Sequence, residues 1–357
     1  MDYMKDNKEI SAEEAVILWQ ASRLSLSKSY EKAPEILKVH SSVIGTLGNF
    51  SASIGKAKSK KTFNVSAIVA AALKNGTVLR YVAELPEDKR KVLYVDTEQS
   101  PYHCLKVMTR ILRMAGLPDD RDNENLEFLA LRKYTPEQRI RIVEQAIYNT
   151  PDIGLVIIDG IRDMVYDINS PGESTRIISK LMQWTDDRQI HIHTILHQNK
   201  GDENARGHIG TELNNKAETV LQVEKDKGNG DISHVSAIHI RAMDFEPFAF
   251  RINDKTLPEL IEGYKPETKK PGRPEEEKFD PYRHITEQHR IALEAAFGLK
   301  EEYGYKELED ALIKIYMSVG VKLNHKKAVS LITMLRNKRM IVQENGRKYT
   351  FMPDFHY

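Results

Sequence analysis

The most constraining feature of the sequence is a repeated alternation of short apolar runs and longer helix-like stretches between Val43 and Ile261. Several of the runs are rich in β-branched residues and lack polar alternation, which is typical of strands covered on both faces. This order predicts an α/β fold with a mostly parallel sheet that becomes more antiparallel after Val220. The expected strands are Asn49–Ile54, Val92–Val95, Leu155–Ile158, His193–Leu196, Val220–Val223, Val235–Ile240 and Phe248–Ile252. The expected helices between the earlier strands are Tyr102–Ala115, Pro136–Asn149 and Ser174–Asp187.

The N-terminal segment has a different pattern. Residues 1–40 predict one amphipathic helix, Ala12–Ser25, followed by a polar connector. Ser11 and Glu14 form a capping box at the start of this helix. The α/β domain is therefore expected over residues 41–264.

The C-terminal segment begins with a linker. Residues 265–281 are rich in Pro and charge and have little to bury. Residues 282–357 contain two further expected helices, Tyr305–Val319 and His325–Lys338, and then two strands around the turn signal Asn345-Gly346. Helices followed by such a hairpin predict a small winged-helix-like domain.

Composition restricts the class of protein. A lone cysteine, Cys104, excludes an internal disulfide framework and favours a reducing compartment. No signal peptide and no apolar run of membrane-spanning length is visible, so we expect a cytoplasmic protein without a membrane partner. The net charge is +1, so affinity for nucleic acid would have to come from local basic patches. Both tryptophans, Trp19 and Trp184, lie on helical stripes and are expected in the core.

The segment "SIGKAKSKKTF" has most of the pattern of a phosphate-binding loop. It follows an expected strand and opens an apolar helix, so its backbone N–H groups would face an anion. Lys61 would contact the β- and γ-phosphates of ATP, and the Thr62 hydroxyl would bind Mg²⁺. The second glycine of the pattern is replaced by Lys60, so a basic, solvated turn is the alternative. The candidate nucleotide-binding residues are Gly55, Lys56, Ala57, Lys58, Ser59, Lys60, Lys61, Thr62 and Phe63.

Polar residues follow three other expected strands. Asp159 ends the apolar run "GLVIIDG", in the form of a Walker B element, and can share the magnesium with Thr62. Asp96 and Glu98 end "KVLYVDTEQS", where a carboxylate can activate water. His197 and Gln198 follow a further strand, where an amide can sense the γ-phosphate. The carboxyl ends of parallel strands meet at one edge of a sheet, which is where ligands bind.

These segments resemble RecA-fold ATPases. The resemblance is strongest to the RepA-like replicative helicases, which are ring-forming relatives of DnaB from plasmids and other mobile elements. It is carried by Ser53–Phe63, Lys91–Ser100, Gly154–Gly160 and Thr194–Val223. The resemblance implies a RecA-like sheet, ATP and Mg²⁺ as ligands, and Glu98 and Gln198 in the catalytic roles. It also implies an arginine finger from the neighbouring subunit, for which Arg241 is the candidate.

Two segments are candidates for binding DNA. In the ring helicases, the loop that corresponds to Asn199–Leu213 contacts single-stranded DNA, which points to Lys200 and Arg206 as phosphate contacts. Alternatively, this loop covers the active site and Arg206 reaches the nucleotide. The segment from Lys322 to Lys348 has eight basic residues and one acidic residue. Its candidates for duplex contact are Lys326, Lys327, Arg347 and Lys348; a protein contact or a solvated face is the alternative.

The sequence therefore predicts an ATP-hydrolysing homo-oligomer, expected to be a hexameric ring, that moves along single-stranded DNA. It would act in the replication or mobilisation of a mobile element. The alternative is a DNA-binding switch, such as a loader or a regulator of transposition or excision, that ATP controls without unwinding. A nucleotide-sensing scaffold with negligible hydrolysis is a third possibility, because Lys60 departs from the loop pattern.

Overall fold

The computed structural model describes residues 10–198, 207–264, 280–283, 286–318, 320–344 and 348–354. The chain divides into two compact units, Met1–Pro266 and Glu267–Tyr357. The expected linker lies outside the described residues except for its last two positions.

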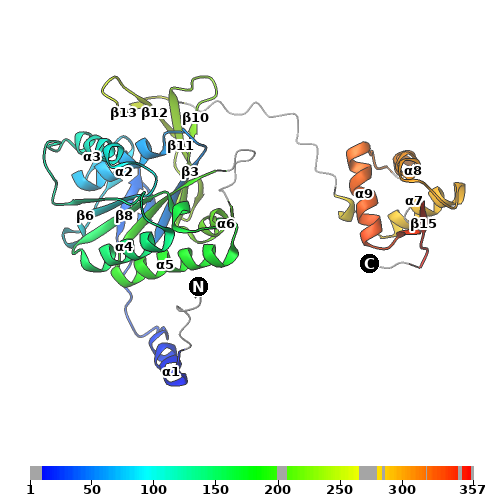
Figure 1. Ribbon diagram of the computed structural model, residues 1–357, viewed down its shortest axis with the longest axis horizontal. Helices are drawn as coiled ribbons and strands as arrows, with labels where there is room; N and C mark the ends of the chain where they lie inside the picture. Colours follow the sequence, from blue (N-terminus) through cyan, green and yellow to red (C-terminus); the bar gives the residue numbers. More distant parts are fainter. Residues whose placement is uncertain are drawn as a thin grey trace. The chain divides into compact units, whose positions relative to one another are not determined.

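The first unit is built around a nine-stranded sheet in the order β13-β12-β11-β10-β3-β9-β8-β6-β7. The six strands from β10 to β7 in this order are parallel, and β11, β12 and β13 continue the sheet in antiparallel fashion. The expected mostly parallel sheet is therefore confirmed (Figure 1). The strands are β3 Phe50–Gly55, β6 Lys91–Asp96, β7 Leu126–Ala130, β8 Ile153–Asp159, β9 His191–His197, β10 Thr219–Lys225, β11 Ile232–Ile240, β12 Phe248–Ile252 and β13 Pro258–Ile261.

Helices cover both faces of this sheet, as Figure 1 shows. One apolar core joins the sheet to α2 and α3, and a second core joins the opposite face to α4, α5 and α6. Adjacent residues of one strand divide between the cores: Tyr94 belongs to the first and Val95 to the second. This explains the continuous apolar runs. The helices are α2 Lys61–Lys74, α3 Pro101–Ala115, α4 Pro136–Asn149, α5 Pro171–Arg188 and α6 Gly207–Lys216, with short 3₁₀ turns η1 Glu87–Lys89 and η2 Ile161–Met164.

A small antiparallel sheet, which the sequence pattern does not predict, contacts α2. Its order is β2-β1-β5-β4, and its strands are β1 Glu35–Val39, β2 Ser42–Thr46, β4 Thr77–Val78 and β5 Tyr81–Ala83. The segment expected to be a polar connector contains β1, which pairs with β2 and β5. The start of the α/β domain moves from residue 41 to Glu35 or earlier.

The N-terminal helix, α1 Ala12–Ala21, is shorter than expected. Ser11 accepts a hydrogen bond from the Glu14 N–H, which confirms one half of the capping box. The placement of Trp184 in the core is confirmed, but that of Trp19 is wrong: Trp184 is fully buried and Trp19 is 60% exposed. No residue of α1 is buried, so its apolar stripe lacks a partner within the described part of the chain.

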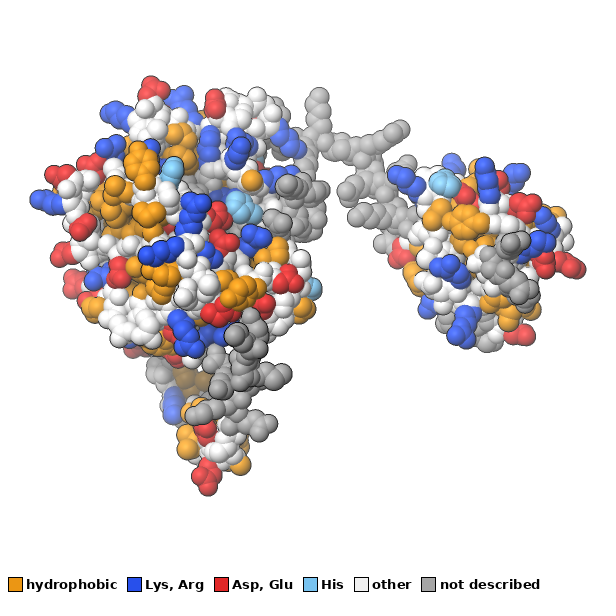
Figure 2. All heavy atoms as spheres, viewed as in Figure 1, with side chains coloured by type: hydrophobic (Ala, Val, Ile, Leu, Met, Phe, Trp, Pro, Cys, Tyr) orange, Lys and Arg blue, Asp and Glu red, His pale blue; other side chains and the backbone are white. Residues whose placement is uncertain are grey.

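The second unit has its own apolar core, formed by three helices and a hairpin. Its elements are η3 Pro281–Arg283, α7 Thr286–Leu299, α8 Tyr305–Ser318, α9 His325–Asn337, β14 Ile341–Glu344 and β15 Lys348–Phe351. The order of elements agrees with the predicted small helical domain and hairpin. Its classification as a winged helix remains a prediction. On the face shown in Figure 2, basic side chains are interspersed with acidic ones on both units.

Candidate nucleotide-binding site

The phosphate-loop candidate occupies the position that its sequence context predicts. β3 ends at Gly55, and α2 begins at Lys61. Eleven residues of α2 are buried, so the helix is firmly held and its free N–H groups remain at the end of the sheet. Such a helix N-terminus attracts anions.

Two residues of this loop hold a left-handed backbone conformation. Lys58 has φ +64° and Lys60 has φ +68°. The pattern's second glycine is thus replaced at a position that favours glycine, with a cost of about 1 kcal/mol. Gly55 is constrained differently, because a Cβ atom there would lie 2.3 Å from the Val223 carbonyl oxygen and 2.7 Å from the Ser59 hydroxyl. The loop is therefore tightly packed despite its four lysines.

Lys61 is buried beneath this loop, with only 5% of its surface exposed. Its Nζ donates hydrogen bonds to the carbonyl oxygens of Gly55 (2.8 Å) and Lys56 (2.9 Å). It also lies 3.0 Å from His197 Nδ1. Burial lowers the pKa of Lys61 to about 8. A bound phosphate would stabilise the charged ammonium group, which burial disfavours. The position of Lys61 therefore suits the binding of an anion.

Thr62 and Asp159 lie together, although 97 residues separate them. The Thr62 hydroxyl donates to Asp159 Oδ2 over 3.1 Å, and the Tyr94 hydroxyl donates to the same oxygen over 3.0 Å. Burial, with the Asp96 carboxylate nearby, raises the pKa of Asp159 to about 7. A buried carboxylate beside a hydroxyl is an oxygen donor set of the kind that Mg²⁺ prefers. These residues therefore fit the predicted metal, and a cation would relieve the cost of the buried charge.

The two acids at the end of β6 have different roles. Asp96 is 1% exposed and accepts hydrogen bonds from the N–H groups of Glu98 (3.0 Å) and Gln99 (2.7 Å). It shapes the turn and is not free to take a proton from water. The Thr97 hydroxyl fixes the same turn to the end of β8, because the carbonyl oxygens of Asp159 and Gly160 both lie 3.0 Å from it and either can accept its hydrogen. Glu98, in contrast, is exposed at the edge of the sheet, and its catalytic role remains a prediction.

His197, from the end of β9, lies between Lys61 and Glu98. Its Nε2 atom is 3.6 Å from Glu98 Oε1. Hydrogen bonding to His197 lowers the pKa of Glu98, so its carboxylate stays ionised at neutral pH. The next residue, Gln198, is 4% exposed, and its backbone N–H donates to the Gly55 carbonyl over 3.0 Å. Gln198 therefore adjoins the phosphate loop, as predicted.

Arg241 lies away from this cluster within its own chain. β11 runs antiparallel to β10 and pairs Ile240 with Thr219, which in turn pairs with Ser51 at the beginning of β3. Arg241, which follows Ile240, is therefore at the sheet edge opposite the phosphate loop. Its guanidinium donates to the Lys216 carbonyl over 3.4 Å. A role for Arg241 in a neighbouring subunit's site remains a prediction.

The DNA-contact candidates are only partly within the described residues. Lys200, Arg206 and Arg347 lie outside them. Lys326 is exposed in the first turn of α9, where Asn324 caps the helix by accepting from the Lys327 N–H over 3.0 Å. Lys348 is exposed on β15 and forms a 2.9 Å ion pair with Glu302. In the free protein this exposed ion pair places a carboxylate beside the Lys348 ammonium group.

Sequence reasoning does not single out three residues that complete the cluster. Tyr94 bonds the metal-site carboxylate, Thr97 fixes the Glu98 turn, and Arg139 donates to the Asp163 carbonyl (2.6 Å) behind that turn. Tyr94 and Thr97 belong to the motif "KVLYVDTEQS", so their places in this motif could have identified them as site residues. Arg139 comes from α4, and nothing in its local sequence indicates this contact.

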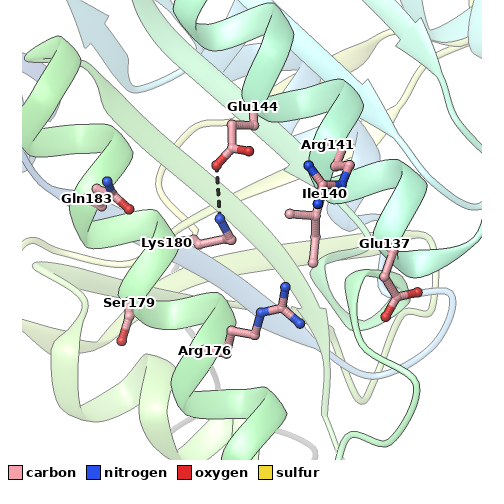
Figure 3. A pocket seen from close by; sticks show the side chains of 8 residues that line it. All are labelled: Glu137, Ile140, Arg141, Glu144, Arg176, Ser179, Lys180 and Gln183. Atoms are coloured by element: carbon pink, nitrogen blue, oxygen red, sulfur yellow. Dashed lines mark hydrogen bonds and ion pairs between the residues drawn. The ribbon is translucent and has the colours of Figure 1, made fainter. Parts of the chain in front are cut away.

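A separate groove of about 500 Å³ lies between α4 and α5 (Figure 3). Glu144 and Lys180 form a 2.9 Å ion pair across it. The side chains that line it carry both signs of charge, and none belongs to the phosphate loop or to the Asp96–Glu98 turn. The lining residues are Glu137, Ile140, Arg141, Glu144, Arg176, Ser179, Lys180 and Gln183. The groove therefore shares no residue with the candidate nucleotide-binding site.

The side chains of Lys61, Thr62, Asp159 and Glu98 form a strand-end cluster at one edge of the mostly parallel sheet, beside the phosphate-loop candidate. Residues 31–203 match a family model described as an AAA domain, which is just under half of the 357 residues. Among solved structures, the chain is similar to the crystal structure of the RadB recombinase, with 15% sequence identity and a TM-score of 0.41. That similarity covers 59% of this chain and 90% of the other. The comparison with curated proteins found no match.

Among the described residues, no helix is both long enough and apolar enough to span a membrane. Within the same ranges, no group of three or more His, Cys, Asp or Glu side chains is arranged to hold a metal ion. The candidate magnesium site differs from such a group because it combines one carboxylate with one hydroxyl.

Proposed function

We propose that this protein hydrolyses ATP and uses the energy to move along or unwind single-stranded DNA as a ring-forming assembly. The observation that carries the ATPase part is the meeting of Lys61, Thr62, Asp159 and Glu98 at one edge of the sheet. The ring, the DNA substrate and a role in a mobile element rest on the resemblance to RepA-like helicases.

The chemistry follows from the positions of the side chains. Lys61 exchanges its bonds to the Gly55 and Lys56 carbonyls for phosphate oxygens. Thr62 and Asp159 would hold Mg²⁺, and the cation would neutralise phosphate charge. Glu98 takes a proton from water as the water oxygen attacks the γ-phosphorus, and the bond from the γ-phosphorus to the departing ADP oxygen breaks. Gln198, beside the loop, supplies an amide for the phosphate or the water, and Arg241 acts on a neighbouring subunit.

The proposed motor activity predicts that the rate of ATP hydrolysis depends on single-stranded DNA. Single-stranded DNA should stimulate hydrolysis many-fold, and the protein should displace an annealed oligonucleotide. Glu98→Gln should keep ATP binding while lowering turnover by about 10²- to 10⁴-fold. ATP binding with no turnover under any DNA condition would contradict the motor.

A second candidate, an ATP-controlled DNA-binding switch, is favoured by the exposed basic start of α9. Lys326 is exposed and Lys327 is half-buried in its first turn. The switch predicts duplex binding that falls when both lysines become Ala, because each phosphate contact adds affinity and salt dependence. Lys314, which is also basic and lies on α8, provides the matched control. Duplex binding that is unchanged in the double variant would remove this candidate.

A further inference from the structure

We infer that the pocket beside Lys60 binds the nucleoside end of the nucleotide, and that Lys60 joins this pocket to the phosphate loop. The inference rests on the proposed function, because it concerns the remainder of the same ligand. It assigns a role to the residue by which this loop departs from the usual phosphate-loop pattern.

The pocket is a hollow of about 630 Å³ on the antiparallel side of the sheet. This volume is in the range of small-molecule sites. Its walls are formed by Lys60, by the β10–β11 turn and by the ends of three strands. The lining residues are Lys60, Asn229, Asp231, Ile232, Arg251, Ile252, Glu259, Leu260 and Ile261.

The topology places this pocket at the edge of the sheet that carries the phosphate loop. β12 runs parallel to β3, so its last residue, Ile252, is at the carboxyl edge. β11 and β13 run the other way, so Ile232 begins β11 at that same edge, and the lining residues of β13, Glu259–Ile261, extend inward from it. The pocket and the loop are therefore neighbours along one edge, and Lys60 belongs to both.

The direction of the nucleotide follows from the strand order. Thr62 faces Asp159 on β8, which lies on the β9 side of β3. The pocket lies on the opposite, β10 side. A nucleotide whose terminal phosphate lies between Thr62 and Glu98 extends its nucleoside away from those residues. On this β10 side of the phosphate loop lies the pocket that Lys60 lines.

Lys60 makes a contact that a glycine could not make. Its Nζ donates a hydrogen bond to the Asp231 carbonyl oxygen, in the turn between β10 and β11. The side chain thus ties the phosphate loop to the wall of the pocket and helps to offset the left-handed backbone at φ +68°. Burial lowers the pKa of Lys60, in keeping with its half-enclosed position.

The lining suits a nucleoside. Ile232, Ile252 and Leu260 offer apolar surface for the faces of a base. The Arg251 guanidinium forms a 3.0 Å ion pair with Glu259, and a guanidinium held in this way presents a flat surface on which a base can stack. The carboxylates of Asp231 and Glu259 are acceptors for ribose hydroxyls. Inorganic polyphosphate has neither a base nor a ribose, so it cannot make these stacking and hydroxyl contacts.

The test compares ATP with inorganic tripolyphosphate, by isothermal titration of the full-length protein in the presence of Mg²⁺. The wild type should bind ATP more tightly than tripolyphosphate. Arg251→Ala combined with Glu259→Ala should weaken ATP binding by about tenfold, a difference of ~1.4 kcal/mol. The same variant should leave tripolyphosphate binding unchanged. Lys60→Gly should also weaken ATP binding more than tripolyphosphate binding.

The control is Arg80→Ala combined with Glu262→Ala, which removes a similar surface ion pair that does not line the pocket. It should leave the affinity for both ligands unchanged. Equal wild-type affinity for ATP and tripolyphosphate, or equal losses of both in the pocket variant, would overturn the inference and leave the phosphate site intact. Failure of the wild type to bind either ligand would instead overturn the proposed function, and this inference with it.

Discussion

At the scale of single residues, burial shifts the pKa values of two ionisable groups in the proposed phosphate site. Lys61 and Asp159 are both buried ionisable groups, and their pKa values are displaced toward neutrality from opposite sides. Each is thus held where its charged form is costly until a ligand of opposite charge arrives. Glu98 differs, because it is exposed and its pKa is lowered by hydrogen bonding to His197. In the proposed site, Lys61 and Asp159 would hold the ligands, and Glu98 would be the ionised base.

The lowered pKa of Lys61 predicts how ATP affinity depends on pH. ATP requires the protonated amine, and the free protein begins to lose that proton near pH 8. Affinity should therefore fall as pH rises above about 8, by at most about tenfold per pH unit. Lys61→Arg keeps its charge throughout, so its affinity should stay level. Fluorescence titrations with a labelled ATP between pH 7 and pH 10 would measure this, and parallel profiles for both proteins would contradict it.

The raised pKa of Asp159 predicts a cost in stability. Its pKa rises from 3.8 to about 7 in the folded protein. Between these values the folded state binds more protons than the unfolded chain, so stability falls as pH rises through this window. In the absence of metal, Asp159→Asn should be more stable at pH 8 by on the order of 2 kcal/mol. The gain should vanish near pH 4.

Urea unfolding of both proteins at pH 4 and pH 8, with a chelator present, would measure this difference. A stability difference that does not change with pH would show that Asp159 is not the titrating group. The variant should also lose turnover, because the same carboxylate is proposed to hold Mg²⁺.

At the scale of elements, β3 and β9 are joined by a buried chain of polar groups below the phosphate site. Ser51 Oγ lies 2.7 Å from both His191 Nε2 and His193 Nδ1, and Ser53 Oγ lies 2.8 Å from His193 Nε2. Burial lowers the pKa of His193 to about 3, so this ring is neutral. A neutral, fully bonded network fixes the two strands whose ends carry the loop and His197.

Ser51→Ala should therefore destabilise the fold by about 1–3 kcal/mol, because two buried ring nitrogens lose a partner. Urea unfolding would measure the loss. Ser179→Ala, on the exposed side of α5, is the matched control and should be neutral. A variant as stable as the control would show that the network contributes nothing.

The elements that sequence analysis predicts are those with long, simple patterns. All seven expected strands and all three expected α/β helices are present, because each contributes to one of the two large cores. The strands β4 and β5 have two and three residues, too few to show a period. β7 has no fully buried residue, as an edge strand, and its pattern is correspondingly weak. The strand-end cluster could be predicted because parallel strands bring their ends together, whereas Arg139 acts through a tertiary contact without a local signal.

At the scale of the whole molecule, α1 is the feature that most needs a partner. Ile17, Leu18 and Trp19 are each more than half exposed. A helix with these exposed apolar side chains and no buried residue gains stability by burying them elsewhere. Sequence analysis places Trp19 in the core because helical periodicity indicates that apolar residues will be buried. Periodicity does not indicate whether they are buried in their own chain or against another molecule.

The proposed ring predicts that α1 becomes buried when the protein assembles. Trp184 is already fully buried, so a change in tryptophan emission should report on Trp19. The emission should shift to shorter wavelength as protein concentration rises, and Trp19→Phe should remove the shift. Sedimentation in parallel should show that deletion of residues 1–25 lowers the assembly state. Unchanged assembly after deletion would contradict this role.

The central claim is that the strand-end cluster hydrolyses ATP in response to DNA. Steady-state ATP hydrolysis with and without single-stranded DNA, in the wild type, Lys61→Ala and Glu98→Gln, tests it most directly. The account predicts strong stimulation by DNA that both substitutions abolish, with ATP binding retained in Glu98→Gln. Tight nucleotide binding by the wild type without turnover in any condition would contradict it.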